Sequence, residues 1–134
     1  NKLLKDDGLF LLHTIGVVDK PSPPNKFINK YIFPGGICPS LSQIVKPIEK
    51  TGLIVADTET LIRHYDKTLL SWLNRFMAKK DLVKDMFDEK FVKMWSFYLA
   101  SCAAAFRYRD LVVFQLQIVK NFNAARPTRD YIYS

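Results

Sequence analysis

The chain has 134 residues, of which 49% are hydrophobic and 25% charged, a composition typical of one folded domain rather than a disordered or fibrous chain. No apolar run approaches the roughly 18 residues of a membrane-spanning helix, which argues against an integral membrane protein. The net charge of +7 favours an anionic partner, such as phospholipid head groups, nucleic acid or an acidic protein. A solvated basic surface explains the same charge equally well, so the charge alone assigns no partner.

The two cysteines, Cys38 and Cys102, have neither the spacing of a metal site nor the number needed for a disulfide framework. This usage favours a reducing cytoplasm, with both thiols buried as small hydrophobic side chains. The first residue is Asn1 and not Met, from which we expect a processed, trimmed or truncated product.

The first regular element is an apolar run over residues 9–15, between Gly8 and Gly16. An apolar run of this length predicts a strand that is buried on both faces. His13 falls at the carboxyl end of this strand, where ligands bind in open α/β sheets. On position alone, a structural histidine is the commoner case.

Prolines at positions 21, 23 and 24 rule out a regular element over residues 17–25, which form either a surface connection or a cover for an active site. A short helix is predicted over residues 27–33, ended by a Pro-Gly-Gly turn. Ser40 is a good N-cap for a helix over residues 41–49, and a second strand follows over residues 53–57.

From Leu61 the pattern is helical, with one apolar stripe formed by Tyr65, Leu69, Trp72, Leu73 and Phe76. A short polar helix or turn over residues 81–86 precedes a second long helix, which Asp88 caps and whose aromatic stripe through Phe106 is typical of core.

The last strand is predicted over residues 110–120, with Phe114, Leu116 and Ile118 on one face. Val113, Gln115 and Gln117 take the other face. These elements make one α/β unit over residues 1–134, with three strands, about four helices and no pairing partner on the upstream side of the first strand.

The chain lacks the common short motifs of catalysis and cofactor binding. Its five glycines form neither a GxGxxG nor a phosphate loop, and HExxH, CxxC and GxSxG are also absent. We therefore predict no metal ligands. His64, near a helix start, is best interpreted as solvated.

Four segments, taken in order, resemble one family. They are LLHTIG at residues 11–16, FINKYIFPGG at residues 27–36 with Pro39 and Ser40, HYDKTL at residues 64–69 with Trp72, Arg75 and Phe76, and residues 91–107 with MW, FYL and AAFR. Over residues 3–120 the chain resembles the carboxyl-terminal part of a cyclopropane-fatty-acyl-phospholipid synthase, a family related to the mycolic acid cyclopropane synthases.

The resemblance implies a Rossmann-like, seven-stranded methyltransferase sheet, of which the chain would hold the last three strands. The final strand, residues 111–119, would lie antiparallel between the other two. The glycine-rich motif that binds S-adenosylmethionine would lie upstream, so the cofactor-binding half is absent and no cofactor-binding residue is assigned in this chain.

The resemblance also implies a reaction and a site. Such enzymes transfer the methyl group of S-adenosylmethionine to a cis double bond in a phospholipid acyl chain; a carbocation forms, and bound bicarbonate removes a proton as the ring closes. His13, the backbone of Ile15 and Tyr65 match positions that hold the bicarbonate. Phe33 matches an aromatic residue beside the sulfonium, and Leu69 a wall of the acyl pocket. The glutamate and cysteine that complete the site come from upstream, and Cys38 is not that cysteine.

We therefore expect a bacterial, cytoplasmic protein that acts at the inner membrane face and is inactive as an isolated chain, binding neither cofactor nor bicarbonate tightly. Candidates for contact with anionic lipid are Lys79, Lys80, Lys84, Lys90 and Lys93, for which a solvated helix face is an equal interpretation. The alternative is a non-catalytic, truncated basic module that binds an anionic membrane surface. Nucleic acid is a poor third partner, and a homodimer is expected to cover the open edge of the first strand.

Overall fold

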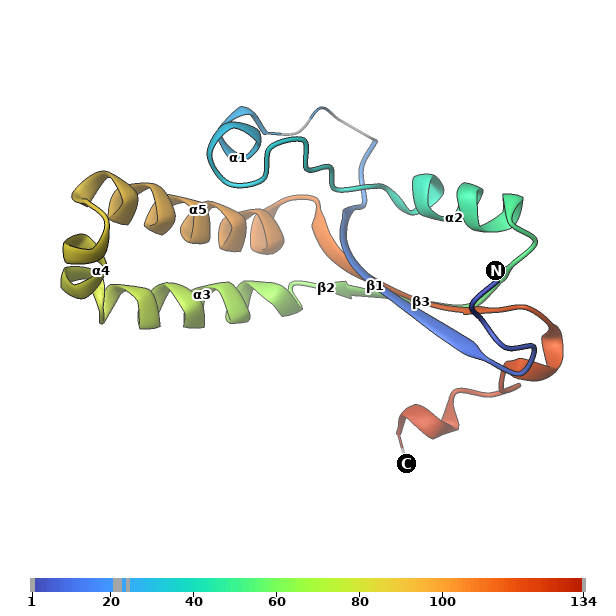
Figure 1. Ribbon diagram of the computed structural model, residues 1–134. Helices are drawn as coiled ribbons and strands as arrows, with labels where there is room; N and C mark the ends of the chain where they lie inside the picture. The colour runs from blue at the N-terminus through green and yellow to red at the C-terminus, as the bar shows by residue number, and fades with distance from the viewer. Residues whose placement is uncertain (1, 21–22, 24, 134) are drawn as a thin grey trace.

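The computed structural model describes residues 2–20, 23 and 25–133, which form a three-stranded sheet with helices packed on both of its faces (Figure 1). The strands are β1 (Leu9–Val17), β2 (Ile54–Ile62) and β3 (Leu111–Val119). Their order in the sheet is β1-β3-β2, and β3 is antiparallel to both neighbours. The predicted α/β fold, with the last strand antiparallel between the other two, is confirmed.

The predicted burial of β1 on both faces is wrong. Leu9, Phe10 and Leu11 are 46%, 47% and 51% exposed, and only the Gly16–Val17 end of the strand is buried. The physical reason is that β1 lies at an edge of the sheet, where β3 covers one side only. The most buried strand is β3, in which Leu116 and Val119 are 0% exposed.

The second strand is longer than the predicted residues 53–57, and Leu61 belongs to it rather than to the following helix. A bulge between Val55 and Asp57 shifts the pairing with β3, after which the ladder continues to Ile62. The chain then turns sharply at Arg63, whose φ of 62° is left-handed, and the helix begins at His64.

The helices otherwise follow the predicted order. Their bounds are α1 (Lys26–Tyr31), α2 (Leu41–Lys50), α3 (His64–Met77), α4 (Lys80–Met86) and α5 (Glu89–Tyr108), followed by the 3-10 turns η1 (Phe122–Ala124) and η2 (Asp130–Ile132). The Asp88 carboxylate accepts a hydrogen bond from the N–H of Phe91 at 2.6 Å, which confirms the predicted cap of α5. Pro21 and Pro24, part of the predicted connection or cover, lie outside the described residues.

Two apolar clusters hold these helices against opposite faces of the sheet. One face of β3 packs Phe114, Leu116 and Ile118 against α2 through Ile44. The other face packs Val113 against α3 and α5, where the buried residues are Leu69, Tyr98, Leu99, Ala103 and Phe106. Helices α3 and α5 run side by side away from the sheet, with α4 at their far end (Figure 1).

Two further sequence expectations concern the cysteines and membrane-spanning helices. Cys38 is exposed and Cys102 is half-buried, so the expectation of two buried thiols is wrong for Cys38, which lies in the open connection between α1 and α2. Among the described residues, none of the helices is long and apolar enough to span a membrane.

Candidate functional site

A row of polar side chains crosses the sheet on the face that α3 and α5 cover only in part. Residues directly opposite each other on paired strands project from the same face. The pairing places His13 opposite Gln115 on one side of β3 and Glu59 opposite Gln115 on the other. The preceding row, formed by Ile15, Val113 and Leu61, is apolar and packs against the helices. The polar row therefore begins where the helical cover ends.

His13 is the exposed end of this row, on the edge strand. Its Nδ1 lies 3.0 Å from Nε2 of Gln115. An amide nitrogen donates and does not accept hydrogen bonds, so Gln115 is the donor and Nδ1 the acceptor. The other ring nitrogen, Nε2, then carries the proton of the neutral ring.

Ile15 lies two residues beyond His13 on the same face of β1, and its side chain packs on the α3–α5 cluster. Val17 donates its N–H to the carbonyl oxygen of Pro39 at 3.0 Å, whereas Val18 donates to Asp110 beside β3. Because N–H groups alternate between the two edges of a strand, the amide of Ile15 points the same way as that of Val17, away from β3. This amide is therefore directed to the edge of β1.

Tyr65 projects from the first turn of α3 and is half-buried. Its ring lies 5.2 Å from that of Phe106 and 6.0 Å from that of Trp72, measured between centroids. Next to it, the buried Asp66 accepts a hydrogen bond from Nε of Arg107 at 2.7 Å. This hydrogen bond is the main reason that the pKa of Asp66 lies below its ordinary value, and it ties the first turn of α3 to the end of α5.

Phe33 and Leu69 differ in exposure. Phe33, after α1, is 55% exposed and makes an edge-to-face contact with Tyr98 at 6.0 Å. Burial raises the pKa of the Tyr98 hydroxyl. Leu69 is 2% exposed and lies inside the α3–α5 cluster, so within the described residues it is a core residue.

The structure brings Ile15, Tyr65 and Leu69 onto one apolar cluster, and Phe33 joins this cluster through Tyr98. His13 stands on the same sheet face, one row beyond. The five residues singled out from the sequence thus lie on the α3–α5 side of the sheet and not on the α2 side.

Comparison with known proteins identifies this arrangement. The family model of mycolic acid cyclopropane synthetase matches residues 1–116. The chain belongs to this family. The cyclopropane-fatty-acyl-phospholipid synthase of Escherichia coli K12 is 41% identical over 113 residues, which cover 84% of this chain and 29% of the relative. Sphingolipid C9-methyltransferase 2 of Gibberella zeae is 32% identical over 127 residues, covering 91% of this chain and 24% of the relative.

A solved structure of a cyclopropane synthase also matches this chain over part of its own length. The mycolic acid cyclopropane synthase CmaA1, crystallised in complex with SAH and CTAB, matches with a TM-score of 0.79 and 31% identity, over 87% of this chain and 46% of that one. The chain therefore matches part of a methyltransferase fold and spans less than a third of the length of these curated relatives. Because the relatives include fungal proteins, membership of the family does not by itself assign a bacterial source.

Three residues beside the site received no role from the sequence: Gln115, Asp66 and Arg107. The signal for Gln115 was available, because a glutamine at the centre of an apolar strand is uncommon without a partner. Asp66 and Arg107 are 41 residues apart and pair only through the packing of α3 on α5. No spacing rule could have joined them.

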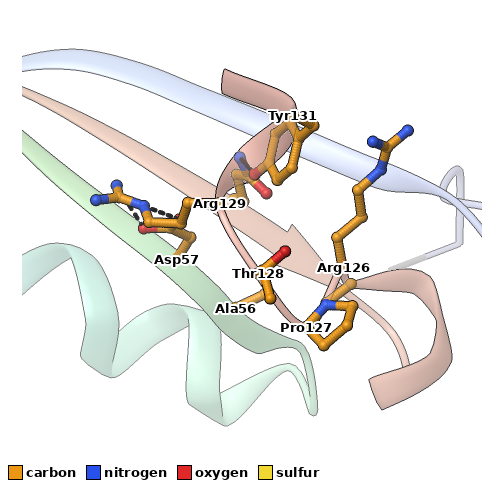
Figure 2. Close-up of a pocket in the computed structure, with 9 residues that line it drawn as sticks. Ala56, Asp57, Arg126, Pro127, Thr128, Arg129 and Tyr131 are labelled. Carbon is orange, nitrogen blue, oxygen red and sulfur yellow. Dashed lines mark hydrogen bonds and ion pairs between the residues drawn. The ribbon is translucent and has the colours of Figure 1, made fainter. Parts of the chain in front are cut away.

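The synthetase family match ends at residue 116, and the tail beyond it folds back over the polar face of the sheet. Arg129 makes a bidentate pair with Asp57, with Nε to Oδ2 at 2.7 Å and Nη2 to Oδ1 at 2.9 Å (Figure 2). Gln117 donates to the hydroxyl of Tyr131. A cavity of about 300 Å³ lies between the tail and β2, lined by Ala56, Asp57, Gln117, Ala125, Arg126, Pro127, Thr128, Arg129 and Tyr131.

The lysines expected to face lipid lie around α4, at the far end of the α3–α5 pair (Figure 1). Lys84 and Lys93 both pair with Glu89, at 3.4 and 3.0 Å. Asp81, Asp85 and Asp88 also interrupt this basic run. Part of its charge is thus neutralised locally.

Proposed function

We propose that residues 1–134 are the carboxyl-terminal part of an S-adenosylmethionine-dependent methyltransferase that modifies the cis double bond of phospholipid acyl chains, as a cyclopropane synthase does. The observation that carries the proposal is the convergence of His13, Ile15 and Tyr65 on one side of the sheet, in a chain of the cyclopropane synthetase family. The E. coli relative carries this activity in its name, and CmaA1 was crystallised with SAH.

Bicarbonate is the proposed base, and the residues present fit a small anion. Nε2–H of His13 and the edge-directed amide of Ile15 are two donors, two residues apart on β1. The hydroxyl of Tyr65 is a third donor on the same side. Donors of this kind hold an anion and leave a lone pair free to take a proton. Phe33 is the proposed wall beside the sulfonium, and Leu69, which is buried in the α3–α5 cluster, is proposed to lie behind the wall of the acyl pocket.

The residues present do not fit S-adenosylmethionine. The glycines at positions 8, 16, 35, 36 and 52 form no glycine-rich loop, so apart from Phe33 beside the sulfonium we assign no contact with the cofactor to this chain. The open edge of β1 and the coverage of 29% of the E. coli relative support an upstream half that supplies those contacts. The isolated chain is therefore expected to be catalytically silent.

Calorimetric titration of the chain with S-adenosylmethionine, in bicarbonate buffer, tests this silence. Absence of binding is the expected result. Saturable binding that is lost in His13→Ala or Tyr65→Phe, but kept in His64→Ala, would overturn it and show that the chain rebuilds the cleft by itself.

A chimera tests the activity. The matching segment of the E. coli synthase is replaced by this chain, and cyclopropane fatty acids are measured in the lipids of cells that lack their own synthase. The expected result is product that falls by at least about 100-fold in His13→Ala or Tyr65→Phe, the range for loss of positioned proton-transfer chemistry. His64→Ala is the matched control, because His64 is exposed on α3. A folded chimera that makes no product, or one indifferent to His13, contradicts the proposal.

An anionic membrane surface at the cytoplasmic face is the proposed docking partner, whether or not the chain is catalytic. Leu82, Met86 and Phe87 are 59%, 66% and 60% exposed on and beside α4, among the lysines at positions 79, 80, 84, 90 and 93. Sedimentation with phosphatidylglycerol vesicles tests this contact. Binding that Phe87→Ser and Lys80→Glu weaken supports it, and equal binding to neutral vesicles contradicts it.

The open edge of β1 leads us to propose a homodimer of the isolated chain. Within the described residues, the Leu9–Leu11 part of this edge has no strand partner and its side chains are exposed, which favours pairing with a second copy. Light scattering is expected to give twice the 15.5 kDa mass of the chain. A monodisperse monomer would rule the dimer out.

A further inference from the structure

Gln115 lies at the best-fixed point of the polar row. It belongs to β3, the strand paired on both sides, and its neighbours Phe114 and Leu116 are 2% and 0% exposed. The backbone of Gln115 is therefore held by two ladders and two buried side chains, while its own amide projects from the opposite face. A side chain on such a rigid element can fix the orientation of a neighbour.

The neighbour that it contacts is His13, directly across the ladder. The 3.0 Å contact joins the amide nitrogen of Gln115 to Nδ1 of the imidazole, and only the amide can donate in this pair. A histidine whose Nδ1 accepts a hydrogen bond carries its proton on Nε2 when neutral. The ring then presents a donor on the side away from the strand.

We propose that Gln115 is a positioning residue for His13, which holds the imidazole as the Nε2–H tautomer so that it presents a donor to a small anion. This inference rests on the proposed function, in which that anion is bicarbonate. The amide N–H of Gln115 fixes the tautomer and orientation of the imidazole, and Gln115 itself touches no reacting atom.

The amide is chemically suited to this task where a carboxylate is not. A glutamate at position 115 would accept from Nδ1–H, and Nε2 would then be left as an acceptor that repels an anion. Glu59 does supply a carboxylate in this row, on the far side of Gln115. Two strand spacings, about 10 Å, separate the positions of Glu59 and His13, so Gln115 is the direct neighbour of the ring.

Nuclear magnetic resonance of the ¹⁵N-labelled chain tests the inference without any activity. Long-range correlations assign the proton to Nδ1 or Nε2 in the neutral ring, and the chain has only two histidines to distinguish. The wild-type chain is expected to show Nε2–H at His13. Gln115→Leu, which removes the donor at similar size, should change the ratio of the two tautomers by about fivefold, the effect of one ordinary hydrogen bond. Gln115→Glu should reverse the preference to Nδ1–H.

Gln117→Glu is the matched control, because Gln117 lies on the same strand and face but bonds Tyr131 instead of His13. It should leave the signals of His13 unchanged, and His64 should be unchanged in all three variants. A Nδ1–H tautomer in the wild-type chain, or an unchanged ratio in a folded Gln115→Leu, overturns the inference.

The chimera separates this inference from the function on which it rests. If Gln115→Glu reverses the tautomer and also lowers product formation, the role of Gln115 and the proposed function are both supported. If the tautomer reverses but product formation is indifferent to His13→Ala, the role of Gln115 in orienting the ring stands and the bicarbonate site at His13 is wrong. If His13→Ala abolishes product and Gln115→Leu leaves the tautomer unchanged, the function stands and the role of Gln115 is wrong.

Discussion

The two faces of β3 differ in polarity and in how completely helices cover them. Toward α2, successive positions are Val112, Phe114, Leu116 and Ile118, all 2% exposed or less. Toward α3 and α5, Val113 is followed by Gln115 and Gln117, which bond His13 and Tyr131. One face is a closed apolar core, and the other changes from apolar to polar within one strand.

The difference shows which face of β3 can hold polar side chains with little loss of stability. A buried polar group must find a partner, and Gln115 and Gln117 have found theirs in a side chain of another strand and in the tail. The α2 face carries the apolar contacts that hold the sheet. Substitutions on the two faces should therefore separate stability from site geometry.

The largest effect is expected on the α2 face. Leu116 is 0% exposed, and Leu116→Ala removes its contacts and leaves a cavity in the cluster under α2. The unfolding free energy should fall by about 3 kcal/mol. Urea denaturation followed by circular dichroism measures this change. Gln115→Ala, the next residue on the opposite face, is the control and should cost about 1 kcal/mol; equal losses for the two variants would remove the distinction between the faces.

A slightly smaller loss of stability is expected at Gly16, where β1 approaches the α2 face of β3. A Cβ at Gly16 would lie 2.5 Å from the ring of Phe114 and 2.5 Å from the carbonyl oxygen of Pro39, so Gly16→Ala must displace both neighbours or shift the strand. The expected loss is about 2 kcal/mol, typical of an overpacked core. Combining it with Phe114→Leu makes room on one side. Denaturation of the double variant should show a loss smaller than the sum of the two single losses, and strict additivity would exclude the ring as the source of the clash.

On the other face, the pair of Asp66 and Arg107 predicts a pH-dependent stability. The hydrogen bond from Arg107 lowers the pKa of Asp66 from its ordinary value of 3.8. A group whose pKa is lower in the folded state stabilises the fold above its unfolded pKa, and this contribution is lost as the pH falls through the folded value. Asp66→Asn should thus be less stable than the wild type near neutral pH, with a difference that shrinks below about pH 4.

Thermal unfolding at a series of pH values measures this effect. Arg107→Leu is the informative partner variant, because it leaves the carboxylate desolvated without its cation. Desolvation favours the neutral acid, so this variant should gain stability relative to the wild type as the pH falls. A constant difference for Asp66→Asn across the acid range would show that the pair contributes no pH dependence.

The two faces also explain what the sequence could predict. The strand predicted over residues 110–120 and the cap of α5 follow from short-range signals: a mostly apolar, alternating run and an aspartate before a helical stripe. The exposure of β1 did not follow, because an edge strand and a central strand of a larger sheet carry the same apolar run. The end of β2 was missed because Leu61 fits both the strand and the stripe of α3, and only the left-handed turn at Arg63 separates them.

The candidate site could be named from the sequence only where a family motif marks it. The roles expected of His13, Ile15 and Tyr65 come from the resemblance, and composition or spacing gave His13 no more than a position at a strand end. The bond between His13 and Gln115 joins residues 102 positions apart and depends on the strand register. Register is set by long-range packing, so this contact required the structure.

The smallest effect is expected at the tail, where the polar face is covered without a core. Arg129→Ala removes both hydrogen bonds to Asp57, while the hydrogen bond of Gln117 to Tyr131 remains. Hydrogen–deuterium exchange in residues 121–133 should become several-fold faster, while the amides of β3 stay protected, since local opening does not require global unfolding. Arg126→Ala, which loses only a contact 5.0 Å above the ring of Tyr131, is the matched control and should have the weaker effect. Unchanged exchange in Arg129→Ala would mean that apolar contacts hold the tail on the sheet. Apolar packing would then hold the cover on both faces of β3.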